Sequence, residues 1–161
     1  AMADLTDEPF LGTDERIRRI KGRGEDKPFI HLIARPKDIF MYTDDSIPTA
    51  LLEKWPGPLT IIVNLKKKSP LKTSLKTVAF RCPGDEWLRT LIEETGRPLY
   101  STSVNRSGFP VLDSVKAIQN EFGGEVDLFV SEGDKKDAVP STIVKVENGK
   151  IVVVRQGDVI I

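Results

Sequence analysis

The segment Trp55-Pro56-Gly57-Pro58 restricts the fold of this chain more than any other part of its sequence. Each proline fixes its own φ at about −65° and removes a backbone donor, so the segment must form a rigid turn. The apolar run from Leu59 to Leu65 follows directly and is the strongest predicted strand in the chain. We therefore expect a β-strand whose first residue is set by the turn before it.

Strands and helices alternate along the chain, and a hairpin ends it. Phe29 to Ala34 and Val78 to Cys82 are predicted as buried strands, each followed by a proline that stops it. Asp85 to Thr95 has the apolar spacing of an amphipathic helix. This order favours an α/β fold, in which a mixed, twisted, open sheet is flanked by helices. Further helices are predicted at Thr13 to Lys21, Ser46 to Lys54 and Ser114 to Phe122, and further strands at Leu99 to Ser103, at Val126 to Val130 and, around an Asn148-Gly149 turn, at Thr142 to Val146 and Lys150 to Arg155.

The length of 161 residues fits one domain with a single core. Residues 1–12 have no apolar periodicity and are expected to form a loose N-terminal arm. Thr13 is a favourable N-cap residue, so the first helix is expected to begin there. We therefore predict an arm over residues 1–12 and a single domain over residues 13–161.

Composition excludes several classes of protein. No apolar run approaches the roughly 18 residues of a membrane span, so no membrane association is expected. Cys82 is the only cysteine and cannot form an internal disulfide, which favours a cytoplasmic location. With His31 as the only histidine, no metal site is expected, and a Ser-His-Asp triad would need a histidine from inside a predicted strand. The net charge is zero, so nucleic-acid binding would require a local basic patch.

Cations gather at the end of the first predicted helix. Lys21 and Arg23 are separated by one glycine, and Lys27 follows four residues later. Cations at a helix-to-loop junction can bind a carboxylate or a polyphosphate, arginine through two parallel hydrogen bonds. The alternative is that they only complement the negative end of the helix dipole.

A polar loop, Ser101 to Gly108, follows the predicted strand that begins at Leu99. Ligands of open α/β sheets bind outside the carboxyl ends of strands, so Ser103 and Asn105 are candidate ligand contacts. Serine and asparagine are also common in turns, and a polar turn without a ligand is the alternative.

Three further polar residues are predicted near strand ends. Arg81 ends a predicted strand, Ser141 begins the closing hairpin, and Arg155 ends it. Because the hairpin folds back on itself, Ser141 and Arg155 can approach the same end of the sheet. The alternatives are that Arg81 is a surface cation and that Ser141 and Arg155 are ordinary polar residues of the hairpin without a ligand.

Taken in order, these residues resemble the motifs of the YrdC/Sua5 family. The Trp-Pro-Gly-Pro turn and the Ser-x-Asn-x-Ser-Gly loop are the most specific of them. The resemblance runs from about Gly12 to the C-terminus. It is carried by Lys21-Gly22-Arg23, Trp55 to Thr60, Val78 to Pro83, Ser103 to Gly108, Pro140 to Val144 and Arg155 to Gly157.

The resemblance implies the YrdC-like fold, similar to that of RibB-like DHBP synthases, and the family reaction. L-Threonine, bicarbonate and ATP would give threonylcarbamoyl-AMP and pyrophosphate. A threonylcarbamoyl transferase would then act with this product on adenosine 37 of tRNA. ATP, with or without Mg²⁺, would be a substrate, and no tightly bound cofactor is implied.

The resemblance also implies roles for individual residues. Lys21 and Arg23 would be catalytic, with Lys21 supporting the phosphates electrostatically. The implied ligand contacts are Arg23, Lys27, Asn105 and Arg155 for ATP, and Arg81, Ser103 and Ser141 for threonine.

The chain differs from the family pattern ahead of its first helix. Family members carry a strand and a Tyr-Pro-Thr loop there, which forms one wall of the threonine pocket, and only Phe10-Leu11-Gly12 is similar in this chain. This difference motivates an alternative function: a catalytically impaired relative that binds double-stranded RNA, tRNA or nucleotide without turnover. Arg16 to Arg23 and Lys66-Lys67-Lys68 would then be the candidate contacts to phosphates.

Overall fold

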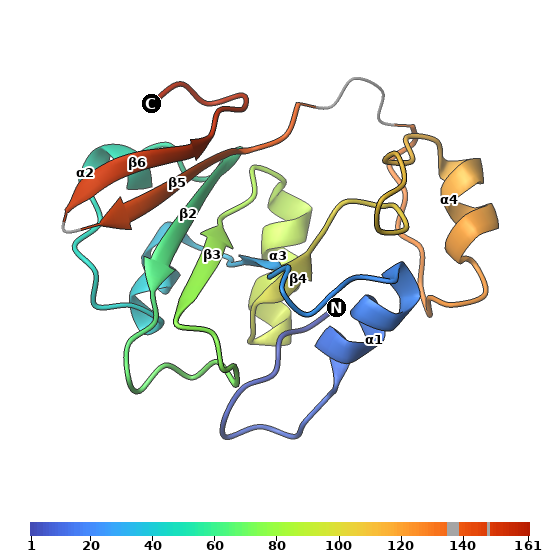
Figure 1. The fold of residues 1–161 in the computed structure, drawn as a ribbon, viewed down its shortest axis with the longest axis horizontal. Helices are drawn as coiled ribbons and strands as arrows, with labels where there is room; N and C mark the ends of the chain where they lie inside the picture. The colour runs from blue at the N-terminus through green and yellow to red at the C-terminus, as the bar shows by residue number, and fades with distance from the viewer. Residues whose placement is uncertain (135–138, 148) are drawn as a thin grey trace.

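The computed structural model describes residues 1–134, 139–147 and 149–161. Among these residues, six strands form one sheet in the order β4-β1-β3-β2-β5-β6 (Figure 1). The strands are β1 (Ile30–Leu32), β2 (Leu59–Asn64), β3 (Thr77–Arg81), β4 (Leu99–Ser101), β5 (Thr142–Glu147) and β6 (Lys150–Arg155). The helices are α1 (Thr13–Lys21), the 3-10 helix η1 (Pro36–Met41), α2 (Thr49–Leu52), α3 (Glu86–Thr95) and α4 (Val115–Phe122).

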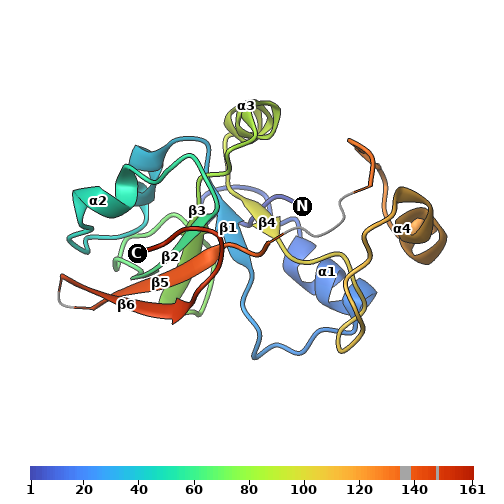
Figure 2. The same ribbon diagram turned by 90° about the horizontal axis from the view of Figure 1, so that it is seen from above.

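The sheet is mixed and open. β1 pairs with β3, and β2 with β5, in parallel, whereas the other neighbouring pairs are antiparallel. α1 lies between the sheet and α4 in both views (Figures 1 and 2). These features confirm the predicted mixed sheet flanked by helices. No helix in the described part of the chain is long and apolar enough to cross a bilayer.

One face of the sheet carries the main core. Ile61, Phe80 and Val144 occupy aligned positions on β2, β3 and β5, and all three are fully buried. Ile39 of η1 and Leu51 of α2 belong to the same cluster. Burial of each such side chain stabilises the fold by about 1.5–3 kcal/mol, so this face is the main source of stability.

The Trp55-to-Pro58 turn is fixed to the strands on either side of it. The buried indole N–H of Trp55 donates to the carbonyl oxygen of Leu59 at 2.7 Å. Gly57 donates its backbone N–H to the carbonyl oxygen of Cys82 at 2.9 Å. A Cβ at Gly57 would lie 2.7 Å from the carbonyl oxygen of Lys54, so only glycine fits this close approach.

The opposite face, which we call the open face, is only partly covered. Leu88 and Ile92 of α3 pack against Leu32 and Leu99 at the β1–β4 end of this face. Farther along, alternate residues of the central strands are half-buried, in contrast to the buried residues between them. The half-buried positions are Ile30, Ile62, Ala79, Arg81, Ile143 and Lys145.

The N-terminal arm packs against the domain instead of lying loose. Ala3 is fully buried, and its N–H donates to the carbonyl oxygen of Pro98 at 2.8 Å. Met2 forms an antiparallel bridge with Leu99 at the outer edge of β4. Isolated bridges of this kind need no repeating pattern, which is why periodicity did not indicate them.

Several expected elements are wrong. The helix expected from Ser46 to Lys54 is limited to α2, which begins after Pro48, and η1 was not predicted. Val126 to Val130 is not a strand, and none of its apolar side chains is fully buried: Val126 and Phe129 are half-buried, and Leu128 is 78% exposed. A strand requires a partner for its backbone groups, and that segment pairs with none of the described strands.

The N-cap of α1 differs from the residue expected from the sequence. Gly12, with φ 64°, occupies the N-cap of α1, and the Thr13 hydroxyl donates to the carbonyl oxygen of Met2, so Thr13 is not the cap. In the expected hairpin turn, Gly149 has φ 75°, and Asn148 lies outside the described residues.

His31 is a core residue and not a surface residue. It is 3% exposed, and its ring lies 5.0 Å from that of Tyr100 and 5.7 Å from that of Phe80, centroid to centroid. Burial lowers the pKa of His31 from 6.5 to about 4. The neutral imidazole is therefore the form that the folded protein holds at neutral pH.

This burial predicts a loss of stability in mild acid. As the pH falls from 6.5 to about 4, the unfolded chain binds a proton at His31 while the folded chain does not. The free energy of unfolding should fall over this interval by about 3 kcal/mol from this group, at about 1.4 kcal/mol per unit of pKa shift. Urea unfolding of the wild type and of His31→Phe at several pH values measures this contribution. Parallel pH profiles for the two proteins would contradict it.

Candidate functional site

Lys21 connects the end of α1 to the Ser101-to-Gly108 loop. Its Nζ donates to the carbonyl oxygens of Ser103 at 2.5 Å and Asn105 at 2.6 Å, and to Oδ1 of Asn105 at 3.0 Å. Lys21 is 5% exposed, and burial, followed by the charge of Arg23, lowers its pKa. An ammonium group has three N–H donors, so the loop uses all of them. In this arrangement Lys21 fixes the shape of the loop and adds positive charge beneath it.

The same loop is ordered by its own side chains. The Ser103 hydroxyl donates to Oδ1 of Asn105 at 2.7 Å. Nδ2 of Asn105 donates to the carbonyl oxygen of Phe109 at 2.7 Å.

The chain can turn from α1 toward β1 because Gly22, with φ 62°, adopts the left-handed conformation that ends the helix.

Arg23 and Lys27 lie on the connection between α1 and β1. Nε of Arg23 donates to the carbonyl oxygen of Lys27 at 3.1 Å, and Nη2 to that of Pro28 at 3.0 Å. The guanidinium also lies 5.1 Å from the ring centre of Phe29. Burial, followed by the charge of Arg18, lowers the pKa of Arg23. The Lys27 side chain is exposed and has no ion-pair partner in the described part of the chain.

Arg81 and Ser141 lie around the rigid turn, with Arg155 beside them. Nε of Arg81 donates to the carbonyl oxygen of Gly57 at 3.2 Å. The Ser141 and Thr60 hydroxyl oxygens are 2.9 Å apart, and Nη2 of Arg155 donates to the carbonyl oxygen of Ser141 at 2.7 Å. The hairpin therefore does bring Ser141 and Arg155 together. Burial lowers the pKa of Arg81, which has no other hydrogen bond from its guanidinium among the described residues.

The predicted site residues thus form two groups. The loop group is Lys21, Arg23, Lys27, Ser103 and Asn105, and the turn group is Arg81, Ser141 and Arg155. β4 runs antiparallel to β1, and β1 runs parallel to β3. The carboxyl end of β4 therefore lies at the edge of the sheet where β1 begins, and Arg81 lies at the opposite edge.

The topology therefore places the loop group and the turn group at different ends of the strands. Within residues 1–134, 139–147 and 149–161, no hydrogen bond or ion pair joins the loop group to the turn group. The half-buried residues of the open face lie between the two edges. A ligand that contacts both groups would therefore have to lie across this face.

A large groove, which the sequence did not predict, lies beside the loop group. Its volume is about 900 Å³, and Lys21, Ser103 and Asn105 of the loop group are among the residues that line it. Trp87 and Leu91, which belong to the apolar side of α3, line this groove, and Trp87 is 55% exposed. The apolar spacing of α3 was correctly predicted, but spacing alone does not show whether these side chains face the core or an open groove. The other walls come from Ile17 and Ile20 of α1, from Val115, Ile118 and Phe122 of α4, and from residues 126–133.

The remaining reactive side chain is unsuited to nucleophilic catalysis. Cys82 is fully buried, and burial raises the pKa of its thiol to about 11. It therefore carries no thiolate at neutral pH. Among the described residues, no group of three or more His, Cys, Asp and Glu side chains could hold a metal ion. What the site offers is fixed cations, hydroxyls and amides, which bind anions and polar ligands.

Comparison with known proteins identifies relatives over most of the chain. A sequence model of the Sua5/YciO/YrdC family, described as "Telomere recombination", matches residues 3–157. The threonylcarbamoyl-AMP synthase of Pyrococcus abyssi is 32% identical over 148 residues, which are 89% of this chain and 44% of that protein. The threonylcarbamoyl-AMP synthase of Pseudoalteromonas translucida is 30% identical over 144 residues, 85% of this chain and 77% of that protein.

Solved structures agree with these matches. Pyrococcus abyssi Sua5, solved in complex with L-threonine, has a TM-score of 0.78 at 30% identity and covers 91% of this chain and 44% of its own. Escherichia coli YciO has a TM-score of 0.73 at 25% identity and covers 91% of this chain and 73% of its own. This chain therefore spans less than half of the Pyrococcus protein. On sequence and fold together, the chain belongs to the Sua5/YciO/YrdC family.

Proposed function

We propose that this chain makes threonylcarbamoyl-AMP and pyrophosphate from L-threonine, bicarbonate and ATP. Family membership supports the proposal, as do the relatives that bear the name threonylcarbamoyl-AMP synthase. The product would then pass to a threonylcarbamoyl transferase that modifies adenosine 37 of tRNA.

The surroundings of Arg81 are the observation that carries the proposal. Its guanidinium is half-buried on the open face and is oriented by one hydrogen bond, from Nε to the carbonyl oxygen of Gly57. Its Nη1 and Nη2 have no hydrogen-bond partner in the described part of the protein, so the forked end can bind a carboxylate through two parallel bonds. Partial burial strengthens such a contact, and Ser141 supplies a hydroxyl at the same edge of the sheet. These groups suit the carboxylate and hydroxyl of threonine.

The loop group suits the triphosphate and nucleotide of ATP. Lys27 offers an ammonium group without an ion-pair partner among the described residues, Arg23 a second cation, and Asn105 an amide held in place by Lys21. Adenylation places negative charge on the α-phosphate and on the departing pyrophosphate, which fixed cations stabilise. The remaining requirement is that the reactants are held in line, so the reaction needs little acid–base chemistry from the protein.

The two groups would divide the substrates between the two edges of the sheet. Threonine would bind at the turn group through Arg81 and Ser141, and the phosphates would bind at the loop group. Ser103 and Arg155 are the two exceptions, because the resemblance implies a threonine contact for Ser103 and an ATP contact for Arg155. Both would act where the two ligands meet. The carbamate formed on the threonine amine would meet the α-phosphate over the open face. Nucleotide binding without turnover is the second candidate, because no hydrogen bond or ion pair joins the two groups among the described residues.

RNA binding through the basic stretch has less support. Arg16 pairs with Asp127 at 2.7 Å, and Arg18 pairs with Asp14 at 2.5 Å. Nζ of Lys66 donates to the carbonyl oxygen of Phe40. Cations already paired with carboxylates contribute less to phosphate binding, so we expect weak, salt-sensitive RNA binding at most.

Replacing Arg81 tests the threonine site. Arg81→Met should lower kcat/KM for L-threonine in pyrophosphate release by about 10- to 100-fold, the scale of a lost charged hydrogen bond. Arg81→Lys keeps the charge but not the fork and should fall between the two proteins. Affinity for a non-hydrolysable ATP analogue is the internal control and should stay within about twofold. An unchanged KM for threonine in Arg81→Met would contradict this assignment.

Replacing Lys27 tests the phosphate contact without disturbing the fold, because this side chain is exposed and unpaired among the described residues. Lys27→Met should weaken binding of the ATP analogue by about 1.5–3 kcal/mol, measured by calorimetry. Lys37→Met removes an equally exposed lysine from η1 and serves as the matched control. Equal losses in the two variants would show that the effect reflects net charge and not a site.

A further inference from the structure

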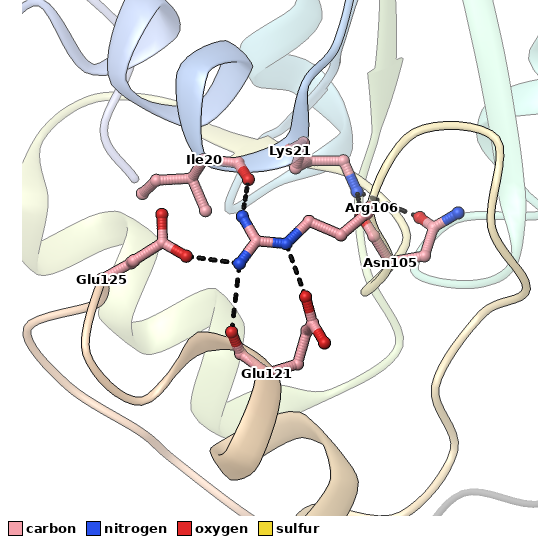
Figure 3. A network of polar contacts seen from close by, with 6 residues as sticks. All are labelled: Ile20, Lys21, Asn105, Arg106, Glu121 and Glu125. Atoms are coloured by element: carbon pink, nitrogen blue, oxygen red, sulfur yellow. Dashed lines mark hydrogen bonds and ion pairs between the residues drawn. The ribbon is translucent and has the colours of Figure 1, made fainter.

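Arg106 stands at the centre of a polar network that the motifs do not explain. It lies in the Ser101-to-Gly108 loop, and Figure 3 shows its guanidinium pointing back to α1 and toward α4. Nη1 donates to the carbonyl oxygen of Ile20. Nε donates to Oε1 of Glu121 at 2.6 Å, and Nη2 donates to the carbonyl oxygen of Glu121 at 3.1 Å and to Oε1 of Glu125. One side chain thus connects three segments of the chain.

The contact with Ile20 satisfies a group that every helix leaves unpaired. The last carbonyl oxygens of a helix have no partner within it. At the end of α1, Arg106 binds the carbonyl oxygen of Ile20, and the N–H of Ser107 donates to that of Lys21 at 2.7 Å. In return, Nζ of Lys21 donates to the oxygens of Ser103 and Asn105. The loop and the helix end therefore hold each other through bonds in both directions.

The glutamates fix the direction of Arg106. The hydrogen bonds that Arg106 donates to Glu125 and then to Glu121 raise the pKa of Arg106, and the bond with Arg106 lowers the pKa of Glu125. The Arg106 side chain is 31% exposed, and ion pairs at such exposure contribute little to overall stability. Its planar fork nevertheless has one favourable orientation when both carboxylates and the Ile20 oxygen are bound together.

We infer that Arg106 is a positioning residue: by joining the loop to α1 and α4, it keeps Lys21 and Asn105 in the arrangement that receives ATP. The consequence for ATP rests on the proposed function. The positioning of Lys21 does not, and it can be measured without any substrate. If Arg106 only attached α4 to the protein, its loss would leave the surroundings of Lys21 unchanged.

Acylation of lysines by acetic anhydride, followed by mass spectrometry, reports how well Lys21 is protected. In the wild type, Lys21 should react more slowly than the exposed Lys27 and Lys37, because its Nζ is bound by loop oxygens. In Arg106→Ala the rate at Lys21 should rise by about tenfold, the scale of one lost hydrogen bond to a charged group. Arg106→Lys should restore part of the protection, and the double variant Glu121→Gln, Glu125→Gln should lose part of it.

Arg16→Met is the matched control. It removes the ion pair of Arg16 with Asp127 and the hydrogen bond from Nη2 of Arg16 to the backbone carbonyl oxygen of Glu125 at 3.2 Å, which also join α1 to the segment after α4. It leaves the side-chain bonds of Arg106 in place, and among the described residues Arg16 has no hydrogen bond or ion pair with the loop or with Lys21. Its Lys21 rate should equal that of the wild type. An equal rise in Arg16→Met and Arg106→Ala would overturn the inference, since it would show that loosening α4 by any means exposes Lys21.

The outcomes separate this inference from the proposed function. Faster Lys21 acylation in Arg106→Ala, together with at least a fivefold loss of ATP-analogue affinity, supports both. Faster acylation in a protein whose wild type binds no ATP analogue supports the positioning role and contradicts the proposed function. An unchanged Lys21 rate overturns the positioning role. If Arg106→Ala does not fold, an unchanged rate in folded Arg106→Lys and in the double variant overturns it equally.

Discussion

The rigid turn before β2 is the constraint on which the rest of the structure depends. Trp55 binds the carbonyl oxygen of Leu59, Gly57 binds that of Cys82, and the N–H of Thr142 donates to the carbonyl oxygen of Pro58 at 3.0 Å. One turn therefore fixes the start of β2, the carboxyl end of β3 and the start of β5 at a single edge of the sheet. The oriented guanidinium of Arg81 and the hydroxyl of Ser141 are consequences of that arrangement. A binding site needs groups whose positions are set by the scaffold, and here the scaffold sets them through backbone bonds.

The direction of β4 is the second constraint, and it shapes the chemistry. Because β4 runs antiparallel to β1, the loop that follows it lies at the edge opposite Arg81. Cations and amides at one edge and a guanidinium with a hydroxyl at the other leave the open face between them. Under the proposed function, this face would bring together two different ligands, an anionic nucleotide and a small amino acid, without a nucleophile of its own. The buried Cys82 and His31 are consistent with this division, because both are neutral at pH 7 and belong to the core.

Sequence reasoning succeeded where the determinants were local. β2 and β3 were found from apolar runs bounded by prolines, and α3 from its spacing and Gly96. It failed where the outcome depends on distant partners. The apolar pattern of Val126 to Val130 does not show that the segment lacks a partner among the described strands. Likewise, no sequence pattern shows that Lys21 donates its hydrogen bonds to loop oxygens. The candidate site residues were predicted from residue type and order, whereas their division into two groups depends on strand direction, which a single sequence does not encode locally.

The most direct test of this account is synthesis of the product itself from labelled bicarbonate. The protein would be incubated with ATP, L-threonine and ¹⁴C-bicarbonate, and nucleotides would be separated and counted. The account predicts a labelled threonylcarbamoyl-AMP that forms only when all three substrates are present, in step with pyrophosphate release. Binding of an ATP analogue without any labelled product would contradict it, and would identify the chain as a nucleotide-binding member of its family without this activity.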